Sequence, residues 1–226
     1  ISHRILLEYN IVNQILAKHP FPKTEKYIQE IFWRIYWKGW LELRPDVWTD
    51  FVKESSVDNQ SQAYLDAINA ETNIDFFNAW VRELKEYNYL HNHARMWFAS
   101  IWVFTLKLPW QLGASFFMEN LYDGDPASNT LSWRWVAGLQ TKGKNYLATK
   151  SNIEKYSNII VGRINLIDNA APIIEPYHYP VQSLSYNIKS RSRYHNLLIF
   201  ETELNQQHSK VDYASYDNIF VLLLGN

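Results

Sequence analysis

The sequence has no cysteine among its 226 residues. Disulfide bonds, iron–sulfur clusters and zinc–thiolate sites are therefore excluded, and the absence is in keeping with a reducing, cytoplasmic compartment, where we expect the protein. Glycine is also scarce, with 7 residues, while hydrophobic residues make up 47% of the chain. This composition predicts a packed and ordered core rather than disorder.

Long apolar runs and an excess of positive charge are missing too. The longest apolar stretch, Met96 to Leu106, is too short to span a bilayer, so we expect a buried helix and no membrane association. The net charge of −1 is unusual for a dedicated duplex-DNA binder, because a basic face supplies most non-specific affinity. Positive charges nonetheless cluster at residues 142–150 and 189–193, and either run could contact phosphate. A solvated loop is the alternative for the second run.

Aromatic residues are abundant, with 10 Trp, 15 Tyr and 11 Phe. Large core side chains are one explanation for so many rings. Stacking surfaces and redox-active indoles are the other, and we expect the set to divide between the two.

Apolar residues recur with helical period through the first part of the chain. Pro20 and Pro22 are expected to end the first helix, and Pro109 to end the fourth. No dinucleotide glycine motif, P-loop or alternating strand–helix rhythm is present, so we predict an all-α bundle. The predicted helices are residues 5–17, 24–41, 73–86, 89–106, 111–121 and 132–140.

The pattern changes at Ile159. Three prolines between residues 172 and 180 break any helix, and residues 197–200 and 219–224 have the apolar composition of short strands. The sequence therefore predicts a mainly α fold with two parts. These are a helical domain at residues 1–158 and an extended, partly β appendage at residues 159–226.

The most informative segment is residues 119–135, which combines two carboxylates, a glycine turn, an amide and two tryptophans. A ring system with donor edges needs acceptors such as Asp123 and Asp125, held close together by the glycine between them. Tryptophans at i and i+2 point in different directions, so Trp133 and Trp135 cannot both be core residues on one helix face. The alternative is an Asp-Gly turn followed by an amphipathic helix with two core aromatics.

Read in order, this segment resembles the FAD-binding domain of the photolyase/cryptochrome family, whose signature is Asp-Gly-Asp, a short linker, Asn and then Trp-x-Trp. Residues 91–96 resemble the family's His-Asn-x-x-Arg-Met, and residues 30–36 resemble its Glu-(Leu)-x-Trp-Arg-x-aromatic helix. The resemblance covers residues 2 to about 146 and implies a helical bundle. The matching positions of the signature are Asp123, Gly124, Asp125, Asn129, Trp133 and Trp135.

The resemblance implies FAD as the cofactor. By position, Asp125 would accept from the isoalloxazine edge, Asp123 would pair with Arg95, and Asn129 would face the flavin N5. A plain ion pair within the core is the structural alternative for Arg95 and Asp123. The residues implied in cofactor binding are Asn92, Arg95, Asp123, Asp125 and Asn129.

The resemblance also implies a chain of indoles for electron transfer. Trp133 and Trp110 occupy the family's two inner positions. The third, outer tryptophan has no clear counterpart; Trp48 is the nearest candidate in sequence, and Trp97 or Trp102 could substitute for it.

A lesion-binding cavity is the third implication. Trp33 and Trp135 would provide stacking walls, and Glu30 and Asn92 the polar contacts, so Glu30 is also a candidate catalytic residue. His93 stands where dimer photolyases commonly carry an Arg that reaches DNA phosphate. His91 and His93 are two positions apart and are expected to point apart on a helix, so no metal site is expected. The residues implied in contacts with damaged DNA are Glu30, Trp33, Arg34, Trp37, Asn92, His93 and Trp135.

Three functions are compatible with these residues. The first is a deoxyribodipyrimidine photolyase, a light-driven carbon–carbon lyase that splits pyrimidine dimers in damaged DNA. The second is a cryptochrome-like blue-light photoreceptor without repair activity, and the third is a flavin-binding scaffold. Glu30, Trp33 and Trp135 favour the first function, whereas the net charge, His93 and the missing outer tryptophan favour the others. We expect the first.

Overall fold

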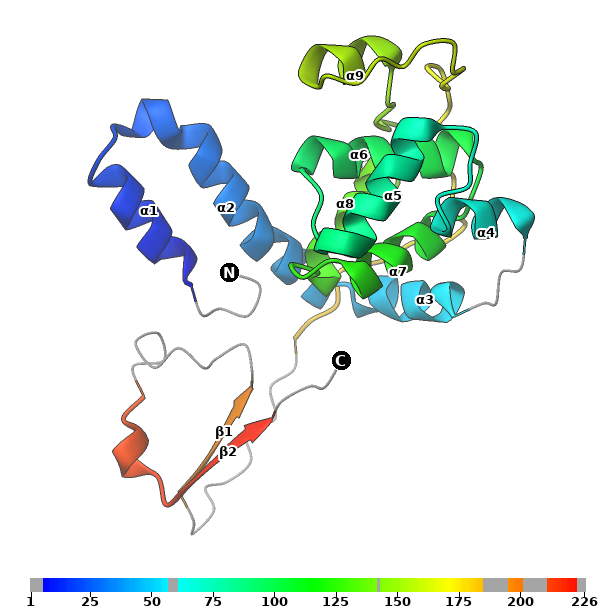
Figure 1. Ribbon diagram of the computed structural model, residues 1–226. Coiled ribbons are helices and arrows are strands. Elements are labelled where there is room, and N and C mark those ends of the chain that lie inside the picture. The colour runs from blue at the N-terminus through cyan, green and yellow to red at the C-terminus, as the bar shows by residue number, and fades with distance from the viewer. Residues whose placement is uncertain (1–5, 57–60, 142, 185–194, 201–210, 223–226) are drawn as a thin grey trace. The chain divides into compact units, whose positions relative to one another are not determined.

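The computed structural model of this chain describes residues 6–56, 61–141, 143–184, 195–200 and 211–222. Over these residues the chain is mainly helical, as the sequence predicts, with one small sheet (Figure 1). None of the helices described is both long and apolar enough to cross a membrane. The basic run at residues 189–193 lies outside the described ranges.

The chain divides into two compact units. The first comprises Ile1–Tyr36 and Ser183–Asn226, and the second comprises Trp37–Gln182. The units meet after residues 36 and 182. The predicted domain boundary after residue 158 coincides with neither position and stays a prediction. Residues 159–182 belong to the second unit because they pack on its helices.

The first unit contains helix α1 (Glu8–Leu16), most of helix α2 (Phe21–Glu42) and a parallel pair of strands, β1 (Asn196–Phe200) and β2 (Asn218–Leu222). The strands pair in register, with Asn196 opposite Asn218 and Phe200 opposite Leu222. Both predicted strands are therefore present, although residues 223 and 224 lie outside the described ranges.

Helix α2 begins three residues earlier than predicted. Pro22 lies in its first turn, where the backbone N–H that proline lacks would have no partner within the helix. The proline that was expected only to end the preceding helix is thus accommodated at the start of the next one.

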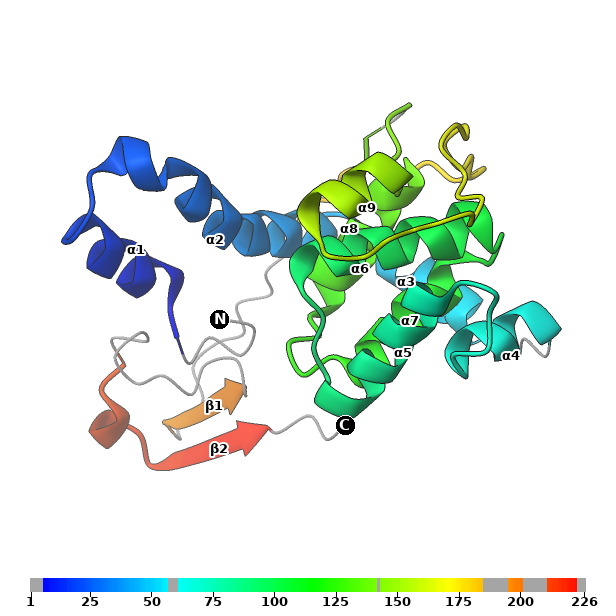
Figure 2. The ribbon, with the colours of Figure 1, turned by 45° about the horizontal axis from the view of Figure 1, so that its top comes forward.

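The second unit is a helical bundle in which α6, α7 and α8 pack together at the centre (Figures 1 and 2). Helix α6 continues into a π-helical turn at Ile101–Thr105, so the predicted helix at 89–106 is confirmed in its main part. The sequence gives no prediction for α3, α4 or α9. The helices of this unit are α3 (Pro45–Ser55), α4 (Gln62–Ile68), α5 (Asp75–Tyr87), α6 (Asn92–Ser100), α7 (Trp110–Asn120), α8 (Pro126–Ala137) and α9 (Lys150–Tyr156).

Large rings form the centre of this bundle, with Trp102 and Trp133 among its most deeply buried side chains. Gly113 of α7 is required for their packing. A Cβ atom at this position would lie 2.3 Å from Cη2 of Trp133 and 2.9 Å from Nε1 of Trp102. Any other residue here would force the two indoles apart.

Residues 170–182, called the strap below, are extended and lie against the bundle. The Ile173 N–H donates to the Ala137 carbonyl at 2.9 Å, and the Gln182 N–H donates to the Leu43 carbonyl at 2.9 Å. Helix α8 ends at Gly138, whose φ of 87° favours glycine. A Cβ on this glycine would also lie 2.5 Å from the Cβ of Pro172. The strap is therefore held to the last residue of α8 and to Leu43, which follows α2.

Candidate functional site

Asp125 is buried, with 4% of its surface exposed, at the start of α8. Its side chain caps the helix by accepting the Ser128 N–H at 2.9 Å, and Pro126 follows as the first helical residue. The other carboxylate oxygen lies 3.1 Å from Nζ of Lys38, on α2. A carboxylate has about four acceptor positions, so Asp125 retains capacity for a further donor.

The cap explains why α8 starts at residue 126 and not at 132 as predicted. Asp-Pro is a typical helix start, since aspartate is a favoured N-cap and proline a favoured first residue. This local signal was readable from the sequence. The partner Lys38 was not, because nothing in the local pattern connects it with Asp125.

Asn129 lies one turn further along α8, and its backbone N–H donates to the Asp125 carbonyl at 2.8 Å. Its side-chain Nδ2 donates to the Ala114 carbonyl of α7 at 2.8 Å. This contact fixes the orientation of the amide inside the bundle. Asp125 and Asn129 therefore present two oriented polar groups within the bundle interior.

Arg95 and Asp123 form an ion pair, with Nη1 and Oδ2 3.1 Å apart. Arg95 Nε also donates to the Leu90 carbonyl at 2.8 Å, and the guanidinium lies 5.3 Å from the Tyr89 ring centroid. The two side chains are 22% and 39% exposed, so the pair stabilises the fold only slightly. More important is that this ion pair lies beside the turn that precedes α8.

The histidine motif has a different geometry from the one that the spacing predicts. His91 is the N-cap of α6 and lies before the helix, so its ring stacks on His93 at 5.6 Å and does not point away. His93 also stacks on Trp97 at 5.6 Å and on Tyr156 at 5.5 Å. Asn92 is exposed at the first position of α6. Within the described ranges, no three His, Asp or Glu side chains are placed to hold a metal ion.

Trp133 is 2% exposed and is surrounded by rings. Its ring centroid lies 5.1 Å from Phe117 and 6.2 Å from Trp102. The ring centroids of Trp102 and Tyr64 are in turn 6.0 Å apart. A series of neighbouring rings therefore leads from Trp133 through Trp102 toward α4.

Trp110 is linked to Trp48 by an intervening ring. Phe51 stacks on Trp110 at 5.7 Å and lies 5.3 Å from Trp48. Trp48 is half-buried, and its place as the outer tryptophan of an electron-transfer series stays a prediction.

Of the lesion residues predicted on α2, Glu30, Trp33 and Arg34 lie in the first unit, whereas Trp37 belongs to the second. Glu30 is exposed, Trp33 is 45% exposed, and Trp33 makes an edge-to-face contact with Tyr36 at 5.4 Å. Trp135 belongs to the second unit, where it stacks on Tyr146 at 5.6 Å. A cavity shared by Trp33 and Trp135 stays a prediction, as do the DNA contacts of Arg34 and Trp37.

One buried ion pair was not anticipated from the sequence. Arg134 of α8, 3% exposed, binds Glu175 of the strap through both guanidinium Nη atoms, one of them at 2.7 Å. Its guanidinium also lies 5.3 Å from the ring centroid of Tyr179. Tyr179 donates its hydroxyl to Asp50 at 3.0 Å. Burial raises the pKa of Tyr179, and this hydrogen bond adds to the rise.

Comparisons with known proteins place these residues in context. Residues 27–160 match the family model for the FAD binding domain of DNA photolyase. The deoxyribodipyrimidine photo-lyase of Streptomyces griseus is 34% identical over 122 residues, covering 52% of this chain and 26% of that protein. The enzyme of the same name from Escherichia coli strain K12 is 30% identical over 128 residues, covering 53% of this chain and 26% of its own length.

Among solved structures, a bacterial class III photolyase from Agrobacterium tumefaciens aligns with 58% of this chain and 28% of its own. The TM-score is 0.49 and the sequence identity is 26%. The chain therefore spans only about a quarter of the length of the curated relatives it matches.

FAD, the cofactor predicted from the sequence, is the one that this family's domain binds. The second unit has the polar groups that such a ligand requires. Asp125 and Asn129 are oriented within the bundle, and four further polar atoms of α8 are buried without a hydrogen-bond partner in the described part of the chain. Buried polar atoms are usually partnered, so their concentration on this helix fits a polar ligand. These atoms are Ser128 Oγ, Thr130 Oγ1, Trp133 Nε1 and Arg134 Nε.

Proposed function

We propose that this chain, which belongs to the family of FAD-binding domains of DNA photolyase, acts in light-dependent repair of pyrimidine dimers, as a deoxyribodipyrimidine photolyase does. Its substrate would be damaged DNA and its reaction that of a carbon–carbon lyase. The observation that carries this proposal is the buried polar pair Asp125 and Asn129 at the start of α8, beside the ring cluster around Trp133.

Each of these groups has a distinct task in the proposal. Bound FAD supplies the light-absorbing ring and the electron that breaks the dimer. Asp125 accepts from the donor edge of the ring, and Arg95 fixes Asp123 in the adjoining turn. Asn129 offers an amide that does not titrate, and the apolar bundle excludes water from its surroundings. Trp133 supplies electrons from the bundle centre, with Trp110 and Trp48 behind it.

Trp133→Phe tests this electron supply. Phenylalanine preserves a ring in the cluster but is far harder to oxidise, so blue-light reduction of bound FAD should slow about tenfold or more, equivalent to at least about 1.4 kcal/mol in barrier. FAD content should be unchanged. The measurement is the decay of the oxidised-flavin absorbance under constant illumination.

Trp80→Phe is the matched control, because Trp80 is also buried but is not a ring neighbour of Trp133. Its reduction rate should match that of the unaltered chain. Equal rates in all three proteins would show that Trp133 is not the donor.

Binding of damaged DNA tests the substrate. Phosphate contacts release counterions, so affinity for a dimer-containing oligonucleotide should fall steeply with salt, with a slope of about −0.9 per contact in log K against log salt. Arg34 lies four residues after Glu30 and three residues before Trp37 on α2, so these side chains share one face of the helix. Arg34→Gln should therefore reduce the slope by about one contact.

Arg82→Gln serves as the control, since Arg82 is an exposed residue of α5 and is not among the residues implied in contacts with damaged DNA. Its salt slope should equal that of the unaltered chain. A salt-independent affinity, or no preference for the dimer at low salt, would count against repair.

A cryptochrome-like photoreceptor is the second candidate function. The observation that favours it is His93, which is stacked against Trp97 and Tyr156 at the position where the resemblance leads one to expect an arginine. Repair of a dimer-containing oligonucleotide under blue light separates the two functions, since the photoreceptor would reduce its flavin and leave the dimer intact.

A further inference from the structure

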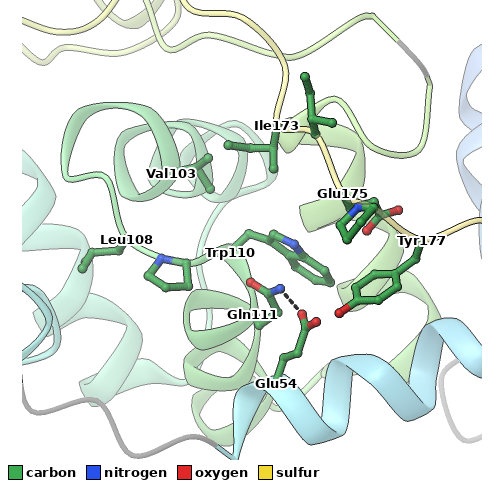
Figure 3. Close-up of a pocket in the computed structure, with 11 residues that line it drawn as sticks. Glu54, Val103, Leu108, Trp110, Gln111, Ile173, Glu175 and Tyr177 are labelled. Carbon is green, nitrogen blue, oxygen red and sulfur yellow. Dashed lines mark hydrogen bonds between the residues drawn. The ribbon is translucent and has the colours of Figure 1, made fainter.

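A cavity of about 250 Å³ lies in the second unit between α3, α7 and the strap (Figure 3). It has two chemically different parts. Glu54, Gln111 and Tyr177 gather at one side of Trp110, whereas Val103, Leu108 and Ile173 lie toward the other. None of the five residues predicted to bind the cofactor lines it.

The two carboxylates that line this cavity differ in how their charge is compensated. Glu175 is held by the guanidinium of Arg134. Glu54 accepts a hydrogen bond from the neutral Gln111 amide, and no Lys or Arg pairs with it within the described residues. In the part of the chain that the structure describes, the cavity therefore contains one carboxylate without a cationic partner.

Tyr177 reports the same negative potential. The nearby Glu54 carboxylate raises the pKa of the Tyr177 hydroxyl, and Asp50 and Glu175 act in the same direction. In Figure 3 the Tyr177 ring approaches the Glu54 carboxylate from the strap, while Glu54 itself projects from α3. Helix α3 and the strap, which are far apart in sequence, thus flank the Glu54 carboxylate.

Aromatic surface adjoins this position. Trp110 and Tyr177 both line the cavity. Phe51 stacks on Trp110 and the Arg134 guanidinium lies 5.8 Å from the Trp110 ring centroid, so Tyr177, which is 49% exposed, is the ring that can attract a further cation. Small-molecule sites in proteins typically combine such apolar and aromatic walls with a few polar groups that set the orientation of the ligand. The acidic end of the cavity would pair with the charged group of a ligand, and the aliphatic end would contact the apolar part of the same ligand.

We infer that this cavity binds a small organic ammonium ion, with the ammonium group at Glu54 beside Trp110 and Tyr177 and the apolar body against Val103, Leu108 and Ile173. The site is additional to the proposed repair function and does not depend on bound FAD. A neutral molecule of the same shape lacks the charge that Glu54 requires and binds much more weakly.

Titration calorimetry on the full chain tests the site, with phenethylammonium as the probe and 2-phenylethanol as its neutral counterpart. Phenethylammonium binds in the millimolar range or tighter and shifts the NMR signal of the Gln111 side-chain amide, which is assigned by its loss in Gln111→Leu. The neutral alcohol binds at least about tenfold more weakly. Equal binding of the two probes, or no binding of either, overturns the inference.

Glu54→Gln locates the charge. It removes the carboxylate while keeping the shape, and it reduces affinity for phenethylammonium about tenfold or more. Glu83→Gln, at an exposed glutamate of α5, is the matched control and leaves the affinity unchanged. An unaltered affinity in Glu54→Gln overturns the site. If Glu54→Gln does not fold, the comparison of the two probes on the unaltered chain decides.

Discussion

Glu175→Gln is expected to lower the free energy of unfolding by about 3–5 kcal/mol, the usual cost of removing one partner from a buried ion pair. Arg134 is 3% exposed and has no other carboxylate partner in the described ranges, so the substitution leaves its charge buried and uncompensated. The strap would also lose a main attachment to α8. Urea denaturation followed by circular dichroism measures the change.

The matched control is Glu154→Gln, the same substitution in a partly exposed i,i+4 pair with Lys150; glutamine keeps the side-chain oxygen that accepts the Val161 N–H. Surface pairs of this kind contribute little, so stability should change by less than about 1 kcal/mol. The double variant Arg134→Met with Glu175→Met should recover part of the loss, because no charge is then left buried. A single Glu175→Gln variant as stable as Glu154→Gln would contradict the role of this pair.

Asp125→Ala is expected to reduce both stability and FAD binding. The loss of the helix cap costs about 0.5–2 kcal/mol, and an unpaired donor at the flavin edge costs a further 1–3 kcal/mol or so of binding. Stability is measured on the apoprotein and affinity by flavin fluorescence. If Asp125→Ala retains full yellow colour and affinity, the proposed position of the ring is wrong.

Two further variants separate the cap from the cofactor contact. Asp125→Asn keeps a good N-cap but removes the charge that pairs with Lys38, whose side chain is 38% exposed, so apoprotein stability should fall less than in Asp125→Ala while FAD affinity falls. Thr149→Ala removes the corresponding cap of α9, where Thr149 accepts the Asn152 N–H. It should lower stability by about 1 kcal/mol and leave FAD affinity unchanged.

The helices were predictable where the signals are local. Apolar periodicity identifies α5 and α7 almost at their observed ends, because it depends only on which residues share a face. Errors occur at proline. Pro22 was interpreted as an end of a helix although it lies in the first turn of α2, and Pro45, at the first position of α3, was not used as a start signal.

The chemistry of the candidate site was predictable only through the order of its motifs. Their spacing identifies Asp123, Asp125 and Asn129 as a set, and the pair of Asp123 with Arg95 implied by the resemblance is present in the structure. The motifs say nothing of Lys38, which forms an ion pair with Asp125. They also do not show that Phe51 lies between Trp110 and Trp48.

The sequence by itself thus determined the family, the cofactor and the helical character, since these depend on motifs and periodicities confined to short segments. Only the tertiary structure decided which charges meet. Arg134 pairs with Glu175, whereas Glu54 accepts a hydrogen bond from the neutral side-chain amide of Gln111. The physical reason is that an ion pair requires two atoms within about 4 Å, and separation along the chain sets no such distance. The folding of the strap onto α8 brings Glu175 to Arg134, and the packing of α3 on α7 brings Glu54 to Gln111.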